Sequence, residues 1–539
     1  MDQKSQTGSP QLSRHLVSYL LFFSVISLTW AVLANGQGRS VAREPISETT
    51  CSGQRYSYYG LAAYGSVSSS ATDRYGDTLG GFGSAISFDQ SSWSKAQDGS
   101  YNGMIWAMPD RGWNTNGTLN YQSRIHKFSI HLDGITPNAS GSDKSPPNMH
   151  LTYVDSVLLT GPDDVPITSL DADATGFISH DGFPPLPRAT YDGDGFGAPG
   201  LTNRRIALDC EGLAIDPGGD FWVSDEYGPY IYRFSKHGKM LFAIQPPPAF
   251  LPLRNGTVSF SAGEPPMFDP NRVPSPPDPT AGRANNQGLE GLTISPDGKF
   301  LYAMMQSAMT QEGGLKRKHR RHARLLVYDI SDKLSPHLVH EYVVTLPPYD
   351  TGRGSEPALQ SEILRLSNEQ FLILARDSGF GRGADNSESR YRHVDVISTV
   401  GSKDIAHSKW DSVNGSIASA KGVLDPDILT ATYCPFLDFN VNSELGKFGL
   451  HNGGSQDKFL LNEKWESLAL VPLGQADSNE TTEYLLFSFS DNDFKTQEGY
   501  QNFGRFRFSD GSGDNIDTQI LAFRMSYEQS SAVSHKNEL

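Results

Sequence analysis

The chain is built from short apolar stretches that end in turn residues. Runs of five or six residues, apolar or alternating with polar ones, recur along it, as in FWVS at 221–224 and FLYAMM at 300–305. Many are bounded by Pro, Gly, Asn or Asp, such as IDPGG at 215–219. Two such runs joined by a short turn are typical of a β-hairpin. Outside residues 16–34, no stretch of ten or more residues has a convincing helical period.

One hairpin pattern repeats through the chain. Each copy has an apolar strand, a turn and a second apolar strand, and the later copies begin with Glu. The copies begin with GGFGSAISFD (80–89), EGLAIDPGG (211–219), EGLTISPDG (290–298), EILRLSNEQ (362–370) and ESLALVPLG (466–474). Repeats of this length with long insertions are typical of structures that assemble similar units side by side.

Further strands follow some of the hairpins, as in YIYRFS at 230–235, ARLLVYDIS at 323–331 and LVHEYVVTL at 338–346. Three or four antiparallel strands per repeat form the blade of a propeller. The 53 glycines and 33 prolines agree with many strands and turns. We therefore expect an all-β fold, a β-propeller of about six blades with long loop insertions.

Carboxylates stand at matching places in the repeats. A Glu begins most first strands, and Asp225 and Glu226 end the second strand of the first EGL copy. In a propeller these positions converge near the axis, where clustered carboxylates repel unless a cation neutralises them. Oxygen-rich sites suit Ca²⁺, so we expect Ca²⁺ as a possible cofactor. The expected metal ligands are Glu211, Asp225, Glu290, Glu362 and Glu466.

Two arginines follow second strands and are candidates for gripping an anionic group, because a guanidinium offers forked donors. They are Arg111 and Arg376, both expected to bind substrate, and Arg376 is also a candidate catalytic residue together with Glu211 and Glu226. The alternative is structural: each Glu would bond backbone amides at the start of its strand, and each arginine would pair with a carboxylate. The residues alone leave both readings open.

The chain ends indicate entry into the secretory pathway. Basic residues precede an apolar stretch at 16–34, which is typical of a signal peptide cleaved after Ala34; an uncleaved membrane anchor is the alternative. The C-terminal KNEL resembles a retrieval signal of the endoplasmic reticulum, so we expect an extracellular or lumenal protein. Five Asn-x-Ser/Thr sites are compatible with a glycoprotein. The expected divisions are 1–34 signal peptide, 35–57 linker, 58–525 propeller and 526–539 tail.

Charge and motifs exclude several function classes. The net charge of −16 argues against nucleic-acid binding. The sequence lacks Gly-x-Ser-x-Gly, His-Glu-x-x-His and Cys-x-x-Cys motifs, so for a hydrolase a metal-held water is the nucleophile most consistent with the remaining residues. Its three cysteines allow at most one disulfide, of undetermined pairing. The basic run LKRKHRRHAR at 315–324 is expected to be a solvated or protease-sensitive loop, with anion recruitment as the alternative.

Four stretches carry a resemblance to a known family. They are DCEGLAIDPGGDFWVSDEYGPYIYRF (209–234), NNQGLEGLTISPDGKFLYAMMQS (285–307), SEILRLSNEQFLILARDSG (361–379) and NEKWESLALVPL (462–473). The chain resembles the phytase-like, or "esterase-like activity of phytase", family from about Tyr58 to about Phe523. The resemblance implies a β-propeller and a phosphoester or ester hydrolase, but a fold does not by itself decide the chemistry. It covers Glu211, Asp225, Glu226, Glu290, Glu362, Arg376 and Glu466.

Two functions therefore follow as hypotheses. The first is a secretory phytase-like hydrolase that cleaves phosphomonoesters or related esters with a metal ion at an acidic mouth. The second is a non-catalytic propeller whose carboxylates are structural and which binds a ligand or a protein partner. We expect a small anionic ester as substrate, no nucleic acid, membrane contact only if the N-terminal segment is uncleaved, and a monomer.

Overall fold

The computed structural model describes residues 44–135, 144–474 and 482–528. Its regular structure in these ranges is nearly all β: many antiparallel sheets, one short α-helix, α1 (Asn442–Leu445), and five 3₁₀ turns. None of the described helices is long and apolar enough to cross a membrane. The expected signal peptide at 1–34 and the KNEL ending lie outside the described residues, as do the glycosylation motifs at Asn138 and Asn479.

Four sheets follow the predicted hairpins, and each has four antiparallel strands in chain order. The first is β3 (Ala85–Lys95), β4 (Tyr101–Met108), β5 (Arg124–Leu132) and β6 (Met149–Leu158). The second is β10 (Cys210–Ile215), β11 (Phe221–Asp225), β12 (Ile231–Phe234) and β13 (Met240–Ile244). The third is β16 (Leu289–Ile294), β17 (Phe300–Met305), β18 (His322–Asp329) and β19 (His337–Thr345). The fourth is β22 (Leu359–Arg365), β23 (Gln370–Arg376), β24 (Arg392–Ser398) and β25 (Thr432–Asp438).

A fifth sheet joins strands from the two ends of the described chain. It contains β1 (Ser47–Cys51), β2 (Gln54–Val67), β31 (Thr518–Tyr527), β28 (Glu483–Asp491), β26 (Lys464–Trp465) and β27 (Ala469–Pro472). Residues 47–57 fall in the range expected to be a linker, but here they form β1 and the start of β2. The SETTC and QRYSYY runs alternate well enough to pair with each other, and β2 also pairs with β31.

Smaller elements occupy the insertions between these sheets. The three-stranded sheet contains β7 (Phe177–Ile178), β8 (Leu186–Asp192) and β9 (Thr202–Ile206). The two-stranded hairpins are β14 (Leu253–Arg254) with β15 (Thr257–Val258), β20 (Pro348–Asp350) with β21 (Ser355–Pro357), and β29 (Gly499–Gln501) with β30 (Phe506–Phe508). The 3₁₀ turns are η1 (Pro248–Phe250), η2 (Thr310–Glu312), η3 (Arg317–His319), η4 (Lys409–Asp411) and η5 (Gly446–Phe448).

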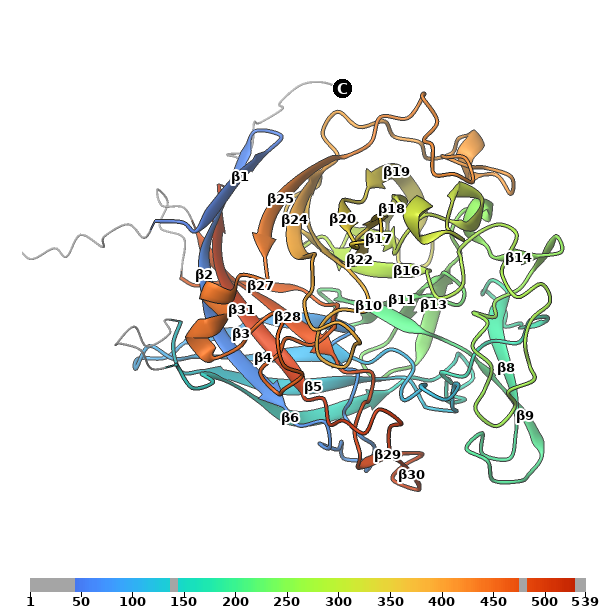
Figure 1. Ribbon diagram of the computed structural model, residues 1–539. Helices are drawn as coiled ribbons and strands as arrows, with labels where there is room; N and C mark the ends of the chain where they lie inside the picture. The colour runs from blue at the N-terminus through green and yellow to red at the C-terminus, as the bar shows by residue number, and fades with distance from the viewer. Residues whose placement is uncertain (1–43, 136–143, 475–481, 529–539) are drawn as a thin grey trace, which may run out of the picture. The chain divides into compact units, whose positions relative to one another are not determined.

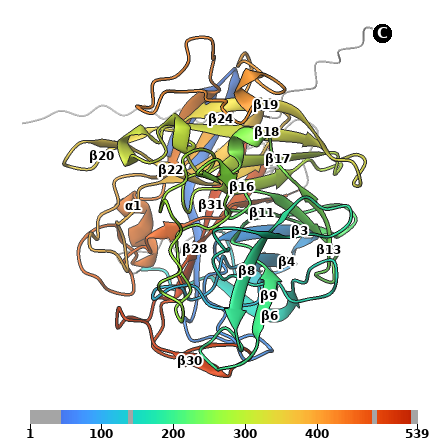
Figure 2. The same cartoon turned by 90° about the vertical axis from the view of Figure 1, so that its right-hand side faces the viewer.

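The five large sheets contact one another in a closed series. Inner strand β3 contacts β10, β10 contacts β16, and β16 contacts β22, as Figures 1 and 2 show for β16 and β22. The fifth sheet meets the fourth through β1 and β25, and it meets the first through β27 and β3. Four apolar cores fill the spaces between successive sheets. A strand can be buried on both faces for this reason, as in β11, where every residue is buried.

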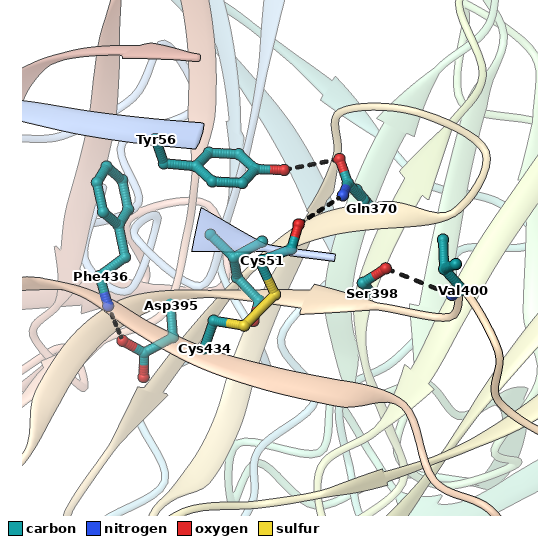
Figure 3. Close-up of a disulfide and its surroundings, with 9 residues drawn as sticks. Cys51, Tyr56, Gln370, Asp395, Ser398, Val400, Cys434 and Phe436 are labelled. Carbon is teal, nitrogen blue, oxygen red and sulfur yellow. Dashed lines mark hydrogen bonds between the residues drawn. A yellow bond between two sulfur atoms is a disulfide. The ribbon is translucent and has the colours of Figure 1, made fainter. Parts of the chain in front are cut away.

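A disulfide joins the fourth and fifth sheets. Cys51 at the end of β1 is bonded to Cys434 of β25 (Figure 3). Beside it, the Tyr56 hydroxyl donates to Gln370 Oε1 at 2.8 Å, and Gln370 Nε2 donates to the Cys51 carbonyl at 3.1 Å. Cys210 is a buried free thiol. The sequence left the cysteine pairing open, and the structure shows that the disulfide links the first strand, β1, to β25 of the fourth sheet.

The all-β prediction is confirmed, and the predicted hairpins are present. The EGLAIDPGG hairpin shows why: Asp216 Oδ1 accepts hydrogen bonds from Gly218 N (2.7 Å) and Asp220 N (3.2 Å), and Gly219 takes the left-handed φ of 86° that this turn requires. Five sheets of four or more strands occur in the described ranges, so the predicted count of six blades is not confirmed.

Candidate functional site

An acidic cavity of about 460 Å³ lies where the inner strands begin. Side chains from four of the five large sheets line it, together with residues of the segment that follows β4 of the first sheet and loops from the insertions. Its charged lining comprises Asp110, Arg111, Glu211, Glu226, Glu290, Arg317, Arg320, Glu356, Arg376, Glu463, Lys464, Glu466 and Asp493. The sequence repeats therefore do bring distant carboxylates to one place.

Breaks in strand pairing aim side chains into this acidic cavity. The antiparallel register shifts at Glu211 and Gly212 in β10, at Glu290 in β16 and at Ser361 in β22. Such β-bulges place an extra residue opposite the partner strand and turn its side chain. Glu211, Glu290 and Ser361 all line the cavity. Glu466, which lies between β26 and β27, lines it as well.

Two groups of three carboxylates share one member. Oxygens of Glu211, Glu226 and Glu290 lie within 4.8 Å of one another, and so do oxygens of Asp110, Asp209 and Glu211. Glu226 Oε2, Glu290 Oε2, Asp110 Oδ1 and both Asp209 oxygens are buried and accept no hydrogen bond from the described residues, and only Asp209 Oδ2 among them has a cation beside it, Arg111 Nη1 at 3.2 Å. Buried charged oxygens without partners are costly. These groups therefore have the composition of a cation site with Glu211 common to both halves.

A third carboxylate group already has a cation of its own. Asp110, Asp491 and Asp493 come equally close to one another. Lys464 Nζ lies among them, 2.9 Å from Asp493 Oδ1 and 3.8 Å from Asp110 Oδ2, and it forms an ion pair with Asp491. Burial lowers the pKa of Lys464, but Asp491 and Asp493 outweigh it, so that the pKa lies well above its usual value. An ammonium group thus neutralises this third group.

Two arginines border the carboxylates. Arg111 Nη1 lies 3.2 Å from Asp209 Oδ2, and Arg376 forms an ion pair with Glu466. Both side chains are about nine-tenths buried. Arg111 Nε and Nη1 and Arg376 Nε make no hydrogen bond with the described residues. Each guanidinium therefore keeps donors for an anionic group while remaining held by a carboxylate.

Burial and mutual repulsion in the acidic cavity favour neutralisation of its carboxylates by protons or by a bound cation. Burial, and then the charges of Glu290, Asp209 and Glu226, raise the pKa of Glu211 well above its usual value. The pKa of Glu290 is raised in the same way by burial and by Glu226 and Glu466. Burial also raises the pKa of Asp209, although Arg111 opposes it. In the absence of a bound cation, these carboxyls hold protons more readily than exposed ones do.

Two of the expected metal ligands lie elsewhere. Asp225 accepts hydrogen bonds from the backbone amides of Asp209 (2.8 Å), Tyr227 (3.2 Å) and Gly228 (2.6 Å). Burial raises the pKa of Asp225 to about 7 in spite of these bonds. Glu362 Oε1 accepts from the amides of Leu292 and Ile363. Neither residue lines the cavity; both hold backbone in place, which is the structural alternative that the sequence left open.

Sequence reasoning missed three residues that lie among these groups. Asp110 stands directly before Arg111, and Asp209 stands two residues before Glu211, so both were adjacent to recognised positions. Lys464 precedes Glu466 by two residues, and only the pairing of β26 with β28 shows that it faces Asp491. A search for carboxylates within two residues of each motif could have found the first two.

Part of the basic run reaches the edge of the acidic cavity. Arg317 and Arg320 line it together with Glu356 of the β20–β21 hairpin. Arg317 begins η3, which contacts β21, and Arg320 Nε donates to the Gly314 carbonyl at 2.6 Å. Arg317 and Arg320 thus line the same cavity as Arg111 and Arg376.

Comparison with known proteins places the chain in a family. Residues 78–440 match the phytase-like family, described as "esterase-like activity of phytase", and the chain belongs to this family. A protein of Arthroderma benhamiae named "Uncharacterized secreted protein" is 54% identical over 464 residues, which is 84% of this chain and 90% of that protein. A solved luciferin-regenerating enzyme aligns over 82% of this chain and 92% of its own, with 10% identity and a TM-score of 0.24. That likeness is too low to support any conclusion.

Proposed function

We propose that the protein is a metal-assisted hydrolase of phosphomonoesters or related esters, with the acidic cavity as its active site. One observation carries the proposal: buried carboxylate oxygens without partners lie beside arginines that keep free donors, in a single cavity. Membership of the phytase-like family supports an ester substrate. The combination suits an anionic ester, because cations and guanidinium groups together neutralise its charge.

The donor set fits a hard divalent cation. Glu211, Glu226 and Glu290 would hold one ion, and Asp110, Asp209 and Glu211 a neighbouring one. All the donors are carboxylate oxygens, which Ca²⁺ prefers over the nitrogen and sulfur ligands typical of zinc. A bound cation of this kind supplies Lewis-acid polarisation of an ester oxygen and makes a water molecule more acidic. Ca²⁺ is therefore the proposed cofactor.

Residues of the chain itself bind the substrate, orient the binding groups and act as catalytic carboxylates. Arg111 and Arg376 bind the anionic group of the substrate, and their partners Asp209 and Glu466 keep the two guanidinium groups oriented. Gly288 N donates to Glu226 Oε1 at 3.1 Å, which fixes this carboxylate and leaves Oε2 without a partner. Glu211 and Glu226 remain the proposed catalytic carboxylates, together with Arg376.

The proposal also covers the architecture and the location. We treat the five contacting sheets as blades of a β-propeller, since each has antiparallel strands in chain order around inner strands that contact the next sheet. The disulfide and the name of the secreted Arthroderma relative support a protein of the secretory pathway. Three of the glycosylation motifs have exposed asparagines, at Asn116, Asn255 and Asn414, as glycosylation would require.

Hydrolysis of p-nitrophenyl phosphate, p-nitrophenyl acetate and phytate by the purified protein tests the proposal. We expect turnover of at least one substrate with Ca²⁺, its loss with a chelator, and a loss of about 10²-fold or more in Glu226→Gln. Glu369→Gln is the matched control, because Glu369 is exposed and lies outside the cavity. Failure of all three substrates, with and without Ca²⁺, would favour a non-catalytic binding protein with structural carboxylates.

A further inference from the structure

A second cavity lies among the loop insertions. Its volume is about 310 Å³, within the range of small-molecule sites. The β8–β9 hairpin, the β29–β30 hairpin and the segment that leads into β5 form its walls. None of the described residues that line this second cavity also lines the acidic cavity. It is therefore a separate site.

The walls of the second cavity rest on an aromatic core of their own. Trp113 stacks on Phe508 with ring centroids 4.6 Å apart, and Phe196 packs on Phe506 at 5.2 Å. This cluster is distinct from the cores that fill the spaces between the large sheets. Long insertions with independent packing are commonly functional. The insertions thus have a packed aromatic cluster of their own beneath the second cavity's walls.

A buried ion pair closes the floor of the second cavity. Arg124 donates to Asp73 at 2.6 Å and to Asp77 at 2.8 Å, and all three side chains are almost fully buried. Asp77 also accepts from Gly504 N at 2.9 Å, which ties the β29–β30 hairpin to the floor. The charged groups of the floor are consequently paired with each other, so the residues available to bind a ligand are those of the walls.

Three wall residues present amide oxygens in a fixed orientation. The side-chain nitrogens of Gln122, Asn203 and Asn502 donate to Leu159 O (3.0 Å), Gly193 O (3.0 Å) and Asp194 Oδ2 (3.1 Å) respectively. These bonds leave Oε1 of Gln122 and Oδ1 of Asn203 and Asn502 without a donor in the described residues. Amide oxygens held in this way can accept hydrogen bonds from ligand hydroxyl groups.

The rim adds an aromatic face and a free cation. Phe503 is 43% exposed, and it and Asn502 have φ values of 60° and 56°, a left-handed conformation that costs energy for a bulky side chain. Arg505 is exposed, and its guanidinium has no partner among the described residues. Arg205 is already engaged, since it donates to Asn120 Oδ1 at 3.2 Å and lies over the Tyr191 ring. Arg505 is thus the available anion-binding group.

We propose that this second cavity binds a sugar unit that bears a carboxylate, such as a uronic acid. Ring hydroxyls donate to the amide oxygens of Gln122, Asn203 and Asn502, the apolar face of the ring lies on Phe503, and the carboxylate pairs with Arg505. A carboxylate matches a guanidinium better than a neutral hydroxyl does, because it accepts two parallel hydrogen bonds. The assignment does not depend on the function of the acidic cavity.

Calorimetric titration of the full-length protein in the presence of a chelator tests this assignment. The ligands are D-glucuronate, D-galacturonate, D-glucose and inorganic phosphate. We expect at least one uronate to bind about tenfold more tightly than glucose and phosphate. Arg505→Ala should weaken that binding about tenfold, and Phe503→Ala should weaken it without changing the melting temperature. Arg507→Ala is the matched control, because Arg507 is exposed in the same hairpin but does not line this cavity.

Three results would overturn the assignment. The first is that neither uronate binds at millimolar concentration. The second is that phosphate binds as tightly as the uronates, and the third is that Arg505→Ala and Arg507→Ala have equal effects. The second result would reassign the cavity to simple anions. Glu226→Gln, which alters the acidic cavity alone, should leave uronate binding unchanged, so failure here and failure of the proposed hydrolase can be told apart.

Discussion

Glu290 and Glu362 hold the same place in the repeated motif but lie in different surroundings. Glu290 is the extra residue at the break in β16 and lines the acidic cavity, where its Oε2 has no partner among the described residues. Glu362 lies one residue after the break in β22, is paired with Leu374, and accepts hydrogen bonds from two backbone amides. Ser361 occupies the break instead. A shift of one residue moves a strand side chain to the opposite face.

The comparison teaches that the contacts of a buried carboxylate, rather than its place in a motif, indicate its role. A carboxylate that accepts hydrogen bonds from backbone amides, as Glu362 does, or that pairs with an ammonium group, as Asp491 does, obtains its partners from the fold itself. One whose oxygens remain without partners destabilises the folded state unless a ligand binds it. The acidic cavity contains oxygens of the second kind, such as Glu226 Oε2 and Glu290 Oε2.

The largest expected effect is on the carboxylate group that Lys464 neutralises. Lys464→Met removes the ammonium group that pairs with all three of Asp110, Asp491 and Asp493, while Lys495 still pairs with Asp493, so we expect the free energy of unfolding to fall by about 3–5 kcal/mol. Urea unfolding in a chelator measures this change. Ca²⁺ should restore part of the loss, since the three carboxylates could then bind it.

The exposed pair of Lys299 with Asp297 provides the control for this prediction. Lys299→Met should change stability by no more than about 0.5 kcal/mol. Equal losses in the two lysine variants would show that the group around Lys464 is not held by its charge.

A direct test contrasts Glu362 with Glu290. Glu362→Leu leaves the Leu292 and Ile363 amides without their acceptor, so we expect a loss of about 1–3 kcal/mol in urea unfolding. Glu290→Gln relieves repulsion from Glu226 and should leave stability unchanged or higher in a chelator. An equal loss in both variants would remove the distinction between the two surroundings.

The pH dependence of the unfolding free energy distinguishes a buried histidine from the carboxyls of the acidic cavity. Burial, assisted by Arg124, holds the pKa of His126 well below its usual value, so the folded protein keeps this ring neutral. Its stabilising effect is complete above the unfolded pKa of about 6.5 and is lost as the pH falls below it, at up to about 1.4 kcal/mol per pH unit. His126→Gln should flatten the unfolding free energy between pH 6.5 and pH 5, roughly.

Exposed His237 serves as the control residue for this pH dependence. His237→Gln should keep the wild-type slope. Glu211 and Glu290 of the acidic cavity cannot account for such a slope, because their raised pKa values make stability fall as the pH rises rather than as it falls. A His126→Gln protein with an unchanged slope would contradict this assignment.

The smallest expected effect comes from placing a Glu at the break in β22, where β10 and β16 already have one. Ser361→Glu adds a carboxylate at the break in β22, so we expect Ca²⁺ affinity to rise by about threefold, measured as a larger Ca²⁺-dependent shift in melting temperature. Ser367→Glu, outside the cavity, is the control. No difference between the two variants would show that the break does not aim this side chain at a cation.

Much of the fold could be predicted from hydrophobic pattern alone, because each hairpin keeps its apolar strands and its turn within a few residues. Matching positions in the repeated hairpins also converge, so most of the cavity's charged residues could be placed together. They are Glu211, Glu226, Glu290, Glu466, Arg111 and Arg376. Glu362 could not, since an unpaired residue in a strand leaves no mark in an apolar run. Lys464 and the joining of β2 with β31 depend on long-range pairing, which local patterns do not encode.

The pairing of β2 with β31 has a consequence for biosynthesis. The fifth sheet needs strands from both termini, so the first strands made must wait for the last ones before they acquire their neighbours. At about 5–20 residues per second, this delay lasts tens of seconds for a chain of this length. During that time the edges of β2 are available to chaperones and to other nascent chains. Oxidation of Cys51 with Cys434 before the final strand arrives would secure the N-terminal strands against such encounters.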